Sequence, residues 1–150
     1  MVKFFFSVKQ LADRKLYDGT GHKPTYSLRT LCRALDIASQ NFCQNPKRSL
    51  LEAFLMCFLT ELDRSSYPVV FGLVLKHLGK GEAVSALKTP IAKPPSGLFV
   101  NIEGYWLSAG EKIPAVPEDF ILTETVRQNL KDVARIVSLS RFAVLLQVLA

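Results

Sequence analysis

Two arginines four residues apart, Arg29 and Arg33, carry the charges in this sequence that could do chemistry. A guanidinium group is permanently charged and offers several N–H donors to phosphate oxygens. At this spacing the two side chains share one face of a helix. From the residues alone, however, the simpler interpretation is favoured: Arg29 is an exposed arginine beside a buried stripe, paired with Asp36.

The net charge of +6 lies in the first third of the chain. Residues 1–50 contain nine Lys and Arg against three Asp and Glu, whereas residues 51–100 and 101–150 are nearly balanced. Such an excess suits a phosphate-rich partner such as a nucleotide or RNA. Composition alone favours the other interpretation, a solvated basic face that aids solubility.

The other reactive side chains form no recognisable site. Cys32, Cys43 and Cys57 contain no C-x-x-C pair, and the two histidines, His22 and His77, are far apart in sequence, so we expect no metal site and no Cys–His or Ser–His–Asp arrangement. Cys32 and Cys57 fall in apolar helical patterns, which predicts reduced core residues. The sequence also contains no G-x-x-x-x-G-K-[ST] loop and no Walker B acidic run.

Apolar periodicity predicts four helices in the first half of the chain, over residues 2–17, 27–40, 49–62 and 65–78. Ser27 is the predicted N-cap of the second helix, which carries the arginines. Its predicted buried stripe recurs at i, i+3, i+4 and i+7 and consists of Leu28, Leu31, Cys32 and Leu35.

The third helix is apolar nearly all round and is therefore predicted to be central, with neighbours on several sides. Asn45 and Pro46 are interpreted as a break before it. Ser49 and Glu52 match the S-x-x-E capping box that opens a helix. Gly79 is the predicted stop of the fourth helix.

Residues 79–97 are rich in glycine and proline, which predicts a linker between a domain at 1–78 and a second one at 98–150. The second part is predicted to contain a short strand at 98–103, a turn at 104–106 and a helix capped by Thr123. The buried stripe of that helix is Val126, Leu130, Val133 and Val137.

Residues 142–147, FAVLLQ, are apolar on both faces, which is typical of a strand inside a parallel sheet covered by helices. The apolar run at the start of the chain is too short for a signal peptide. The densest apolar stretch, Leu50–Leu59, is about half the length needed to span a bilayer, so we expect no membrane partner.

Four segments resemble the midasin family of AAA+ ATPases, and they occur in the same order as in that family. The resemblance extends over most of residues 10–147. The resemblance implies a mainly α fold: a four-helix AAA+ lid-type bundle, then a linker and an incomplete α/β AAA+ part with a short strand, a helix and the strand before Walker A. The segments are DGTGHKPTYSLRTLCRAL (18–35), RSLLEAFLMCFLTELD (48–63), NIEGYWLSAG (101–110) and FILTETVRQNLKDVARIV (120–137).

The resemblance assigns roles to individual residues. It implies that Arg29 occupies the sensor-2 position, where a lid arginine contacts the nucleotide γ-phosphate. Arg33, one turn later, is expected to make a surface or lid-internal contact. The resemblance also implies that Phe120, Ile121 and Leu122 lie near the adenine ring of their own module, although simple packing of the helix start explains them equally well.

Tyr105 and Trp106 have two possible roles. They could form a contact between modules, or they could be buried anchors of their own domain, and the second interpretation is favoured.

The family's activity is ATP- and Mg²⁺-dependent remodelling that releases assembly factors from pre-60S ribosomal particles, in the nucleolus and nucleoplasm. Its expected partners are neighbouring AAA+ modules and those particles. In the family the strand matching FAVLLQ continues into a G-P-T-S-S-G-K-T loop, whereas here VLA follows. We therefore expect a fragment bridging two modules that alone neither binds ATP tightly nor hydrolyses it.

The alternative is a non-catalytic helical interaction module, which docks on an AAA+ ring or a ribosomal particle through its basic residues 1–50. Direct RNA binding is the weaker option, because the basic residues are not interleaved with exposed aromatic residues in a recognisable motif.

Overall fold

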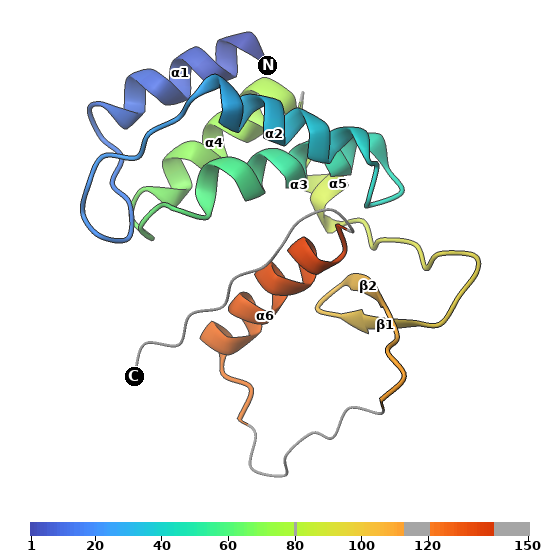
Figure 1. Cartoon of the computed structure of the whole chain (residues 1–150). Coiled ribbons are helices and arrows are strands. Elements are labelled where there is room, and N and C mark those ends of the chain that lie inside the picture. Colours follow the sequence, from blue (N-terminus) through green and yellow to red (C-terminus); the bar gives the residue numbers. More distant parts are fainter. Residues whose placement is uncertain (80, 113–120, 140–150) are drawn as a thin grey trace. The chain divides into compact units, whose positions relative to one another are not determined.

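The computed structural model describes residues 1–79, 81–112 and 121–139, and the chain divides into unit 1, Met1–Pro90, and unit 2, Ile91–Ala150. The described chain is mainly helical with a small two-stranded sheet (Figure 1), which agrees with the mainly α prediction. The elements are α1 (Val2–Ala12), α2 (Leu28–Ser39), α3 (Pro46–Leu59), α4 (Tyr67–Leu78), α5 (Ala83–Lys88), β1 (Phe99–Ile102), β2 (Tyr105–Ser108) and α6 (Glu124–Val137).

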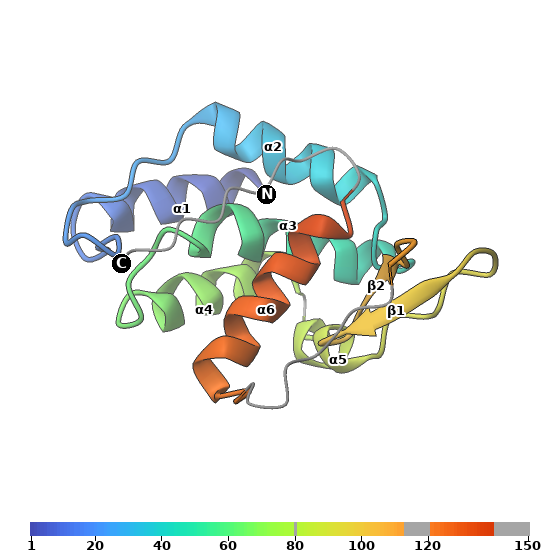
Figure 2. The ribbon, with the colours of Figure 1, turned by 60° about the horizontal axis from the view of Figure 1, so that its bottom comes forward.

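Helix α3 is the central helix of unit 1, as its apolar composition predicts. It packs against α2, α4 and α5, and Figure 2 shows it between α2 and α4. Helix α1 packs on α4 and adds Phe4, whose ring centroid lies 5.3 Å from that of Phe54 and 5.1 Å from that of Phe58, edge to face in both pairs. Such pairs add about 0.5–1.5 kcal/mol each beyond the burial of their area. The core is therefore built around an aromatic cluster.

Helix α3 begins earlier than predicted. Asn45 is its N-cap, since the Asn45 Oδ1 accepts a hydrogen bond from the Arg48 backbone N–H (3.0 Å), and Pro46 is its first residue. Proline at that position has the φ of a helix and lacks an N–H that would be unpaired anyway. Two residues interpreted as a break thus start the helix, and the predicted capping box of Ser49 and Glu52 is wrong because both are buried inside α3.

Helix α2 begins where predicted, but it turns a different face inward. Its buried side chains are Ala34 and Ile37, which lie further around the helix than the predicted stripe. Ala34, Ile37 and the half-buried Leu31 therefore share the face of α2 that is turned inward. Of the predicted stripe, Leu31 is half-buried and the other three residues are exposed. The exposed fraction is 68% for Leu28 and 37% for Leu35, and Cys32 lies between them in the sequence. The prediction that Cys32 is a core residue is therefore wrong.

Helix α1 ends at Ala12, earlier than the predicted residue 17. The backbone N–H groups of Lys15 and Leu16 both donate to the Leu11 carbonyl oxygen, which closes the turn that ends the helix. Phe6, in the middle of α1, is 67% exposed.

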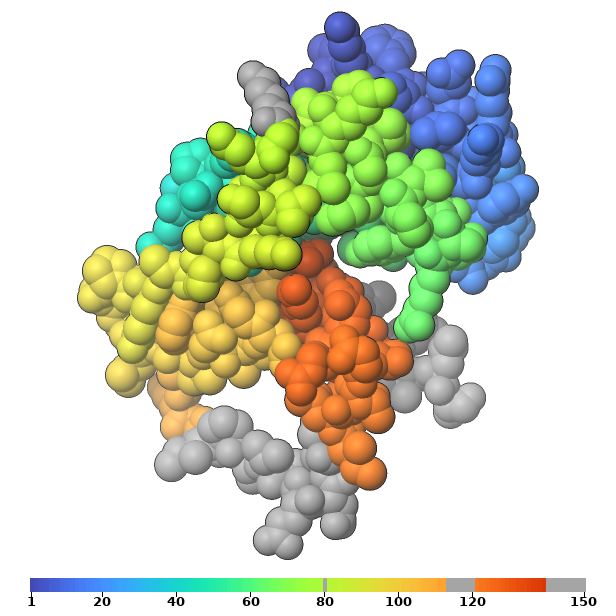
Figure 3. Space-filling view, turned by 180° about the vertical axis from the view of Figure 1, so that it is seen from behind, coloured from blue at the N-terminus to red at the C-terminus, as the bar shows by residue number. Residues whose placement is uncertain are grey.

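Part of the predicted linker is helical and belongs to unit 1. Helix α5 packs on α3 and α4, and Ala83 and Ala86 are buried in the core. Gly79 ends α4 as predicted, and a Cβ at this position would lie 2.1 Å from the Ala83 Cβ. Glycine is needed here because α5 approaches the end of α4 so closely. Seen from behind, α4 forms much of the visible surface of unit 1 (Figure 3, green).

In unit 2, β1 and β2 form an antiparallel hairpin. The predicted strand at 98–103 is confirmed as β1. Glu103 and Gly104 make the turn, with φ of +47° and +92°, the left-handed backbone that two-residue hairpin turns require. The predicted turn at 104–106 is wrong for Tyr105 and Trp106, because both lie on β2.

The aromatic pair on β2 anchors unit 2. Tyr105 is 1% exposed, which confirms it as a buried anchor. The Trp106 Nε1–H donates to the Ile91 carbonyl oxygen (2.9 Å) and so ties the start of unit 2 to the hairpin.

Helix α6 packs on both strands and is capped by Thr123, as predicted, through a hydrogen bond from the Val126 N–H to the Thr123 Oγ1 (3.3 Å). Its buried helical residues are Ala134 and Arg135. The predicted stripe is only partly correct: Val126 and Val133 are half-buried, whereas two members are exposed, Leu130 and Val137.

Two predictions, the strand at 142–147 and the placement of Phe120, fall outside the residues that the structure describes. Among the described residues, no helix is both long and apolar enough to cross a membrane.

Candidate functional site

Arg29 is the second residue of α2 and is exposed to solvent. The helix starts here because of a reciprocal cap: the Thr30 N–H donates to the Ser27 Oγ (3.4 Å), and the Ser27 N–H donates to the Thr30 Oγ1 (3.3 Å). These bonds satisfy backbone donors that a helix start would otherwise leave unpaired. The sequence therefore fixes Arg29 in the first turn of α2.

The start of α2 is also fastened to the core. The Tyr26 hydroxyl donates to the Phe58 carbonyl oxygen (2.7 Å), and the two ring centroids are 5.1 Å apart. Burial raises the pKa of Tyr26 well above its usual value, so the hydroxyl keeps its proton and its role as donor. Tyr26 lies three residues before Arg29, which makes the arginine backbone part of a rigid region.

The loop before α2 is fixed by a polar turn around Asp18. Its Oδ1 accepts hydrogen bonds from the Thr20 Oγ1 (2.7 Å), the Thr20 N–H (2.9 Å) and the His22 N–H (2.8 Å). The bond from the Thr20 hydroxyl is the main cause that lowers the pKa of this carboxyl. The Gly19 N–H donates to the Glu61 carbonyl oxygen (3.1 Å), so the loop is held against the end of α3.

The side chain of Arg29 is available for a ligand. Within the part of the chain that the structure describes, no ion pair joins Arg29 to Asp36, although the simpler sequence interpretation proposed that pair. Arg33 is also exposed, one turn further along. Chemically, the first turn of α2 presents a fixed backbone with a permanent positive charge on a long side chain, which suits a phosphate group.

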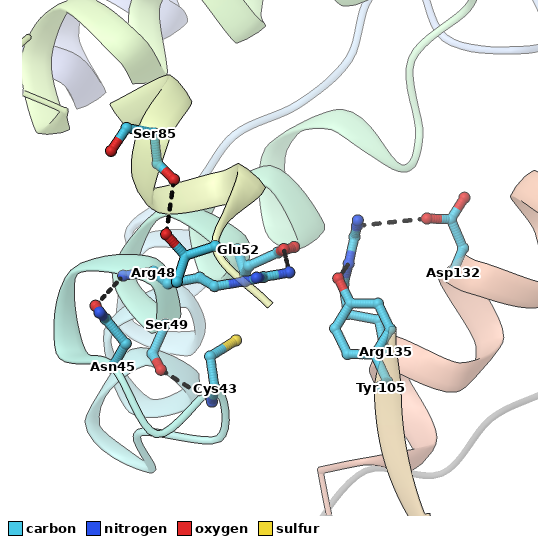
Figure 4. A network of polar contacts seen from close by, with 10 residues as sticks. Cys43, Asn45, Arg48, Ser49, Glu52, Ser85, Tyr105, Asp132 and Arg135 are labelled. Atoms are coloured by element: carbon cyan, nitrogen blue, oxygen red, sulfur yellow. Dashed lines mark hydrogen bonds and ion pairs between the residues drawn. The ribbon is translucent and has the colours of Figure 1, made fainter. Parts of the chain in front are cut away.

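A second polar cluster lies where α2 and α3 meet, and the sequence prediction missed it. Arg48 and Glu52 form a buried ion pair, with 3.5 Å between the Arg48 Nη2 and the Glu52 Oε1 (Figure 4). The Ser49 Oγ accepts from the Cys43 N–H (3.1 Å) and donates to the Asn41 Oδ1 (3.3 Å). These contacts fix the loop between the helices. The i, i+4 spacing of Arg48 and Glu52 was a signal in the sequence that could have indicated the ion pair.

Two of the three cysteines are at least partly buried. Cys43 is buried and Cys57 is half-buried, and burial raises the pKa of Cys57 to about 11 against the weaker opposing effect of Arg33. A thiol with so high a pKa is a poor nucleophile at neutral pH. Among the described residues, no group of His, Cys, Asp and Glu could hold a metal ion.

Unit 2 contains the other candidate residues. Ile121 and Leu122 precede the Thr123 cap, and Ile121 is 77% exposed. Neither side chain is buried in the core of unit 2. The interpretation that Ile121 simply packs against the start of α6 is therefore wrong. Arg29 belongs to unit 1, whereas Ile121 and Leu122 belong to unit 2.

Helix α6 is held to the hairpin by polar contacts (Figure 4). The Arg135 Nε–H donates to the Tyr105 hydroxyl (3.0 Å), and the Arg135 Nη1 lies 3.4 Å from the Asp132 Oδ1. Near the turn, the Arg127 Nη1–H donates to the Glu103 Oε1 (2.9 Å). Arg135 was not expected in a buried position, because a charged residue is rarely buried without partners.

An open hollow of about 450 Å³ lies on the hairpin face that carries Val100, Ile102 and Leu107, with Glu111 and Lys112 at its edge. Its described lining is mainly apolar, and its polar side chains are those of Ser108, Glu111 and Lys112.

Comparison with known proteins identifies the family. Residues 1–81 match the family model of the midasin AAA lid domain. The chain is similar to midasin of Dictyostelium discoideum, with 35% identity over 162 aligned residues and 98% of this chain covered. It is also similar to midasin of Giardia intestinalis, with 27% identity over 135 aligned residues and 77% of this chain covered.

This chain spans about 3% of the length of each of these relatives. No solved structure matches it. The lid match covers more than half of the chain and contains all of α1 to α4, and with it the capped helix that carries Arg29, so this chain belongs to the midasin family.

Proposed function

We propose that this chain is the helical lid of one AAA+ module and the first part of the next in a midasin-family ATPase, and that Arg29 contacts the γ-phosphate of bound ATP. The observation that carries the proposal is the exposed Arg29 in the first turn of a rigidly held helix, inside the segment that matches the lid family. The neighbouring AAA+ modules are then its partners in the same polypeptide.

The physical basis is charge and geometry. Phosphoryl transfer depends on positioning and on neutralising the charge of the phosphate oxygens, and a guanidinium does both. The backbone of Arg29 is fixed by the Ser27 cap and by Tyr26, so little conformational freedom is lost when its side chain binds. Motion of a lid that senses ATP through one arginine then couples hydrolysis to a rigid-body change.

The nucleotide itself must be held elsewhere in the polypeptide. This sequence contains neither a Walker A loop nor a Walker B run, so the backbone amides and the lysine that hold phosphates and organise Mg²⁺ have to come from other segments. We therefore expect ATP and Mg²⁺ to bind the full-length protein and not to bind these 150 residues tightly.

Ile121 and Leu122, with Phe120 before them, are proposed to lie near the adenine ring in the module that unit 2 begins. The exposure of Ile121 supports this assignment, because an apolar side chain left in water gains by covering a base. This proposal depends on unit 2 and is independent of the role of Arg29.

At the level of the whole protein, we propose that the parent ATPase releases assembly factors from pre-60S ribosomal particles in the nucleus, in the nucleolus and nucleoplasm. Family membership supports this role. Direct RNA binding by these residues is not part of the proposal, since the basic residues form no recognisable RNA-binding motif in the sequence.

ATP turnover by the full-length protein tests the role of Arg29. We expect Arg29→Ala to lower kcat for the affected module by about tenfold or more, because it removes charge stabilisation present only near the phosphates. Arg29→Lys should restore part of the rate, since lysine keeps the charge but not the planar fork. Arg33→Ala is the matched control, one turn along the same helix. Equal turnover by the wild type and the Arg29→Ala variant would contradict the proposal.

A further inference from the structure

The segment that follows helix α5 contains a Thr-Pro pair that the proposed function does not involve. The sequence contains eight prolines, and only Pro90 directly follows a serine or a threonine, Thr89. The residue before a proline is held extended, and an extended Ser-Pro or Thr-Pro pair is the substrate of proline-directed protein kinases. Thr89 and Pro90 are both exposed to solvent. The Thr89 hydroxyl is therefore accessible to a second protein.

Thr89 already has the backbone conformation of an extended substrate. It is the C-cap residue of α5, with φ of −64° and ψ of +125°. Pro90 ends unit 1, and Ile91 begins unit 2. Ile91 is buried, and its carbonyl oxygen accepts the hydrogen bond from Trp106. A single exposed proline thus separates Thr89 from the next anchored residue of the chain.

The hydroxyl of Thr89 holds the last turn of α5. Its Oγ1–H donates to the Ser85 carbonyl oxygen (2.9 Å), and the Thr89 backbone N–H donates to the same oxygen (3.1 Å). A phosphate on Oγ1 would remove the hydroxyl donor and add about 1.5 to 2 negative charges. These charges would lie beside the carbonyl oxygens that end the helix, which are themselves partly negative. Repulsion would then replace a hydrogen bond.

Helix α5 is short enough to respond to such a change. It has six residues, and in the described chain no side-chain hydrogen bond caps its start. A helix of this length is not stable in water without packing. The packing of α5 on α3 and α4 buries Ala83 and Ala86, and Glu82 at its start forms an ion pair with Lys47. The last turn, which includes Ala86, is therefore the part that a phosphate on Thr89 releases first.

We propose that Thr89 is a phosphorylation site for a proline-directed Ser/Thr protein kinase, and that the phosphate releases the last turn of α5 from α3. The Thr89 Oγ1 attacks the γ-phosphorus of ATP, the bond from that phosphorus to the bridging oxygen breaks, and ADP leaves. The hydroxyl proton passes to a carboxylate of the kinase. Release lengthens the covalent connection between the lid and unit 2 by the freed residues. This proposal is independent of the assignment of Arg29.

The first experiment measures phosphate incorporation by peptide mass spectrometry in the native full-length protein and in the 150-residue chain, with a purified cyclin-dependent kinase, ATP and Mg²⁺. We expect Thr89 to be modified at least about tenfold faster than Thr25, an exposed threonine that follows a proline instead of preceding one. Pro90→Ala should lower the rate at Thr89 by a similar factor, whereas Thr89→Ser should keep it. Far-UV circular dichroism checks that both variants remain folded.

The second experiment measures hydrogen exchange of the backbone amides before and after phosphorylation. We expect exchange at residues 86–89 to become about fivefold faster or more, because one hydrogen bond is lost and a repulsive charge is added. Exchange in α1 should stay unchanged. Thr89→Val removes the hydroxyl without adding charge, so it should speed exchange at residues 86–88 less than the phosphate does.

Three results would overturn the proposal. The first is no phosphate on Thr89 of the full-length protein while the same kinase modifies a control peptide that contains a Ser-Pro pair. The second is an equal rate at Thr89 in the wild type and in Pro90→Ala, which would mean that the proline is not recognised. The third is unchanged exchange at residues 86–89 after phosphorylation, which would mean that the phosphate leaves α5 in place.

Discussion

Unit 1 and unit 2 are stabilised in different ways. Unit 1 is built on a continuous apolar core with an aromatic cluster of Phe4, Phe54 and Phe58 around the central helix α3. In unit 2, the described residues bury few side chains, and polar contacts carry much of the connection: Arg135 bonds the Tyr105 hydroxyl, and Arg127 bonds Glu103.

This difference in how the two units are stabilised suits unit 1 to the proposed role of Arg29. A unit with its own core holds the backbone of Arg29 rigidly, which suits a sensor that must report on one phosphate. The predictions below test this comparison, from the largest expected effect to the smallest.

Removal of one core ring should destabilise unit 1 strongly. Phe58→Ala should lower the free energy of unfolding by about 3–5 kcal/mol, because it leaves a cavity where Phe4, Phe54 and Tyr26 meet. Urea unfolding of the 150-residue chain followed by circular dichroism measures the change. The control Phe6→Ala should cost less than about 0.5 kcal/mol because Phe6 is exposed. Similar losses for the two variants would mean that the cluster is not the core.

Loss of one hydroxyl should loosen unit 2 alone. Tyr105→Phe removes the acceptor for the buried Arg135 Nε–H and should cost about 1–3 kcal/mol. Hydrogen exchange of the backbone amides should become faster in α6 and stay unchanged in α3. The control is Tyr17→Phe, an exposed site. Faster exchange in α3 would show that the two units do not unfold separately.

The observed start of α3 predicts a smaller effect. Asn45→Ala should lower the free energy of unfolding of unit 1 by about 1 kcal/mol, because it removes the oxygen that caps the helix. Asn45→Asp keeps a capping oxygen and should retain most of the stability. Urea unfolding measures both variants, and an equal loss in the two would remove capping as the explanation.

Acid should weaken unit 1 gradually. The pKa of Asp18 is lowered chiefly by the Thr20 hydroxyl, and that of Asp63 chiefly by the hydrogen bond from Ser65. The unfolded chain therefore takes up protons at a higher pH than the folded chain, so the stabilisation is complete above the usual aspartate pKa and is lost as pH falls through the lower, folded values. The Tm should fall slightly between pH 6 and pH 3, and less so in Asp63→Asn. An unchanged Tm in the wild type would contradict this.

Sequence reasoning succeeded where local chemistry decides the structure. Ser27 and Thr123 were recognised as caps, and Gly79 as a helix end, because each acts on its own neighbours in sequence. The central position of α3 also followed, since a helix that is apolar all round must be buried.

Sequence reasoning failed where packing between helices and strands decides the structure. The face of α2 that turns inward depends on how closely it approaches α3, and the small side chain of Ala34 permits a close contact at that face. Helix α5 was missed because the glycines and prolines around it suggested a linker. One of those glycines, Gly79, is instead required because Ala83 of α5 lies so close to it. The buried Arg135 could not be foreseen, because its partner Tyr105 is remote in sequence.

The most direct test of the central proposal measures hydrogen exchange of residues 27–33 in the full-length protein, with a non-hydrolysable ATP analogue and with ADP. If Arg29 contacts the γ-phosphate, these amides exchange more slowly with the analogue than with ADP, and Arg29→Ala abolishes the difference while Arg33→Ala keeps it. Equal exchange with both nucleotides in the wild type, or a difference that persists in Arg29→Ala, would contradict the assignment of Arg29 as the nucleotide sensor.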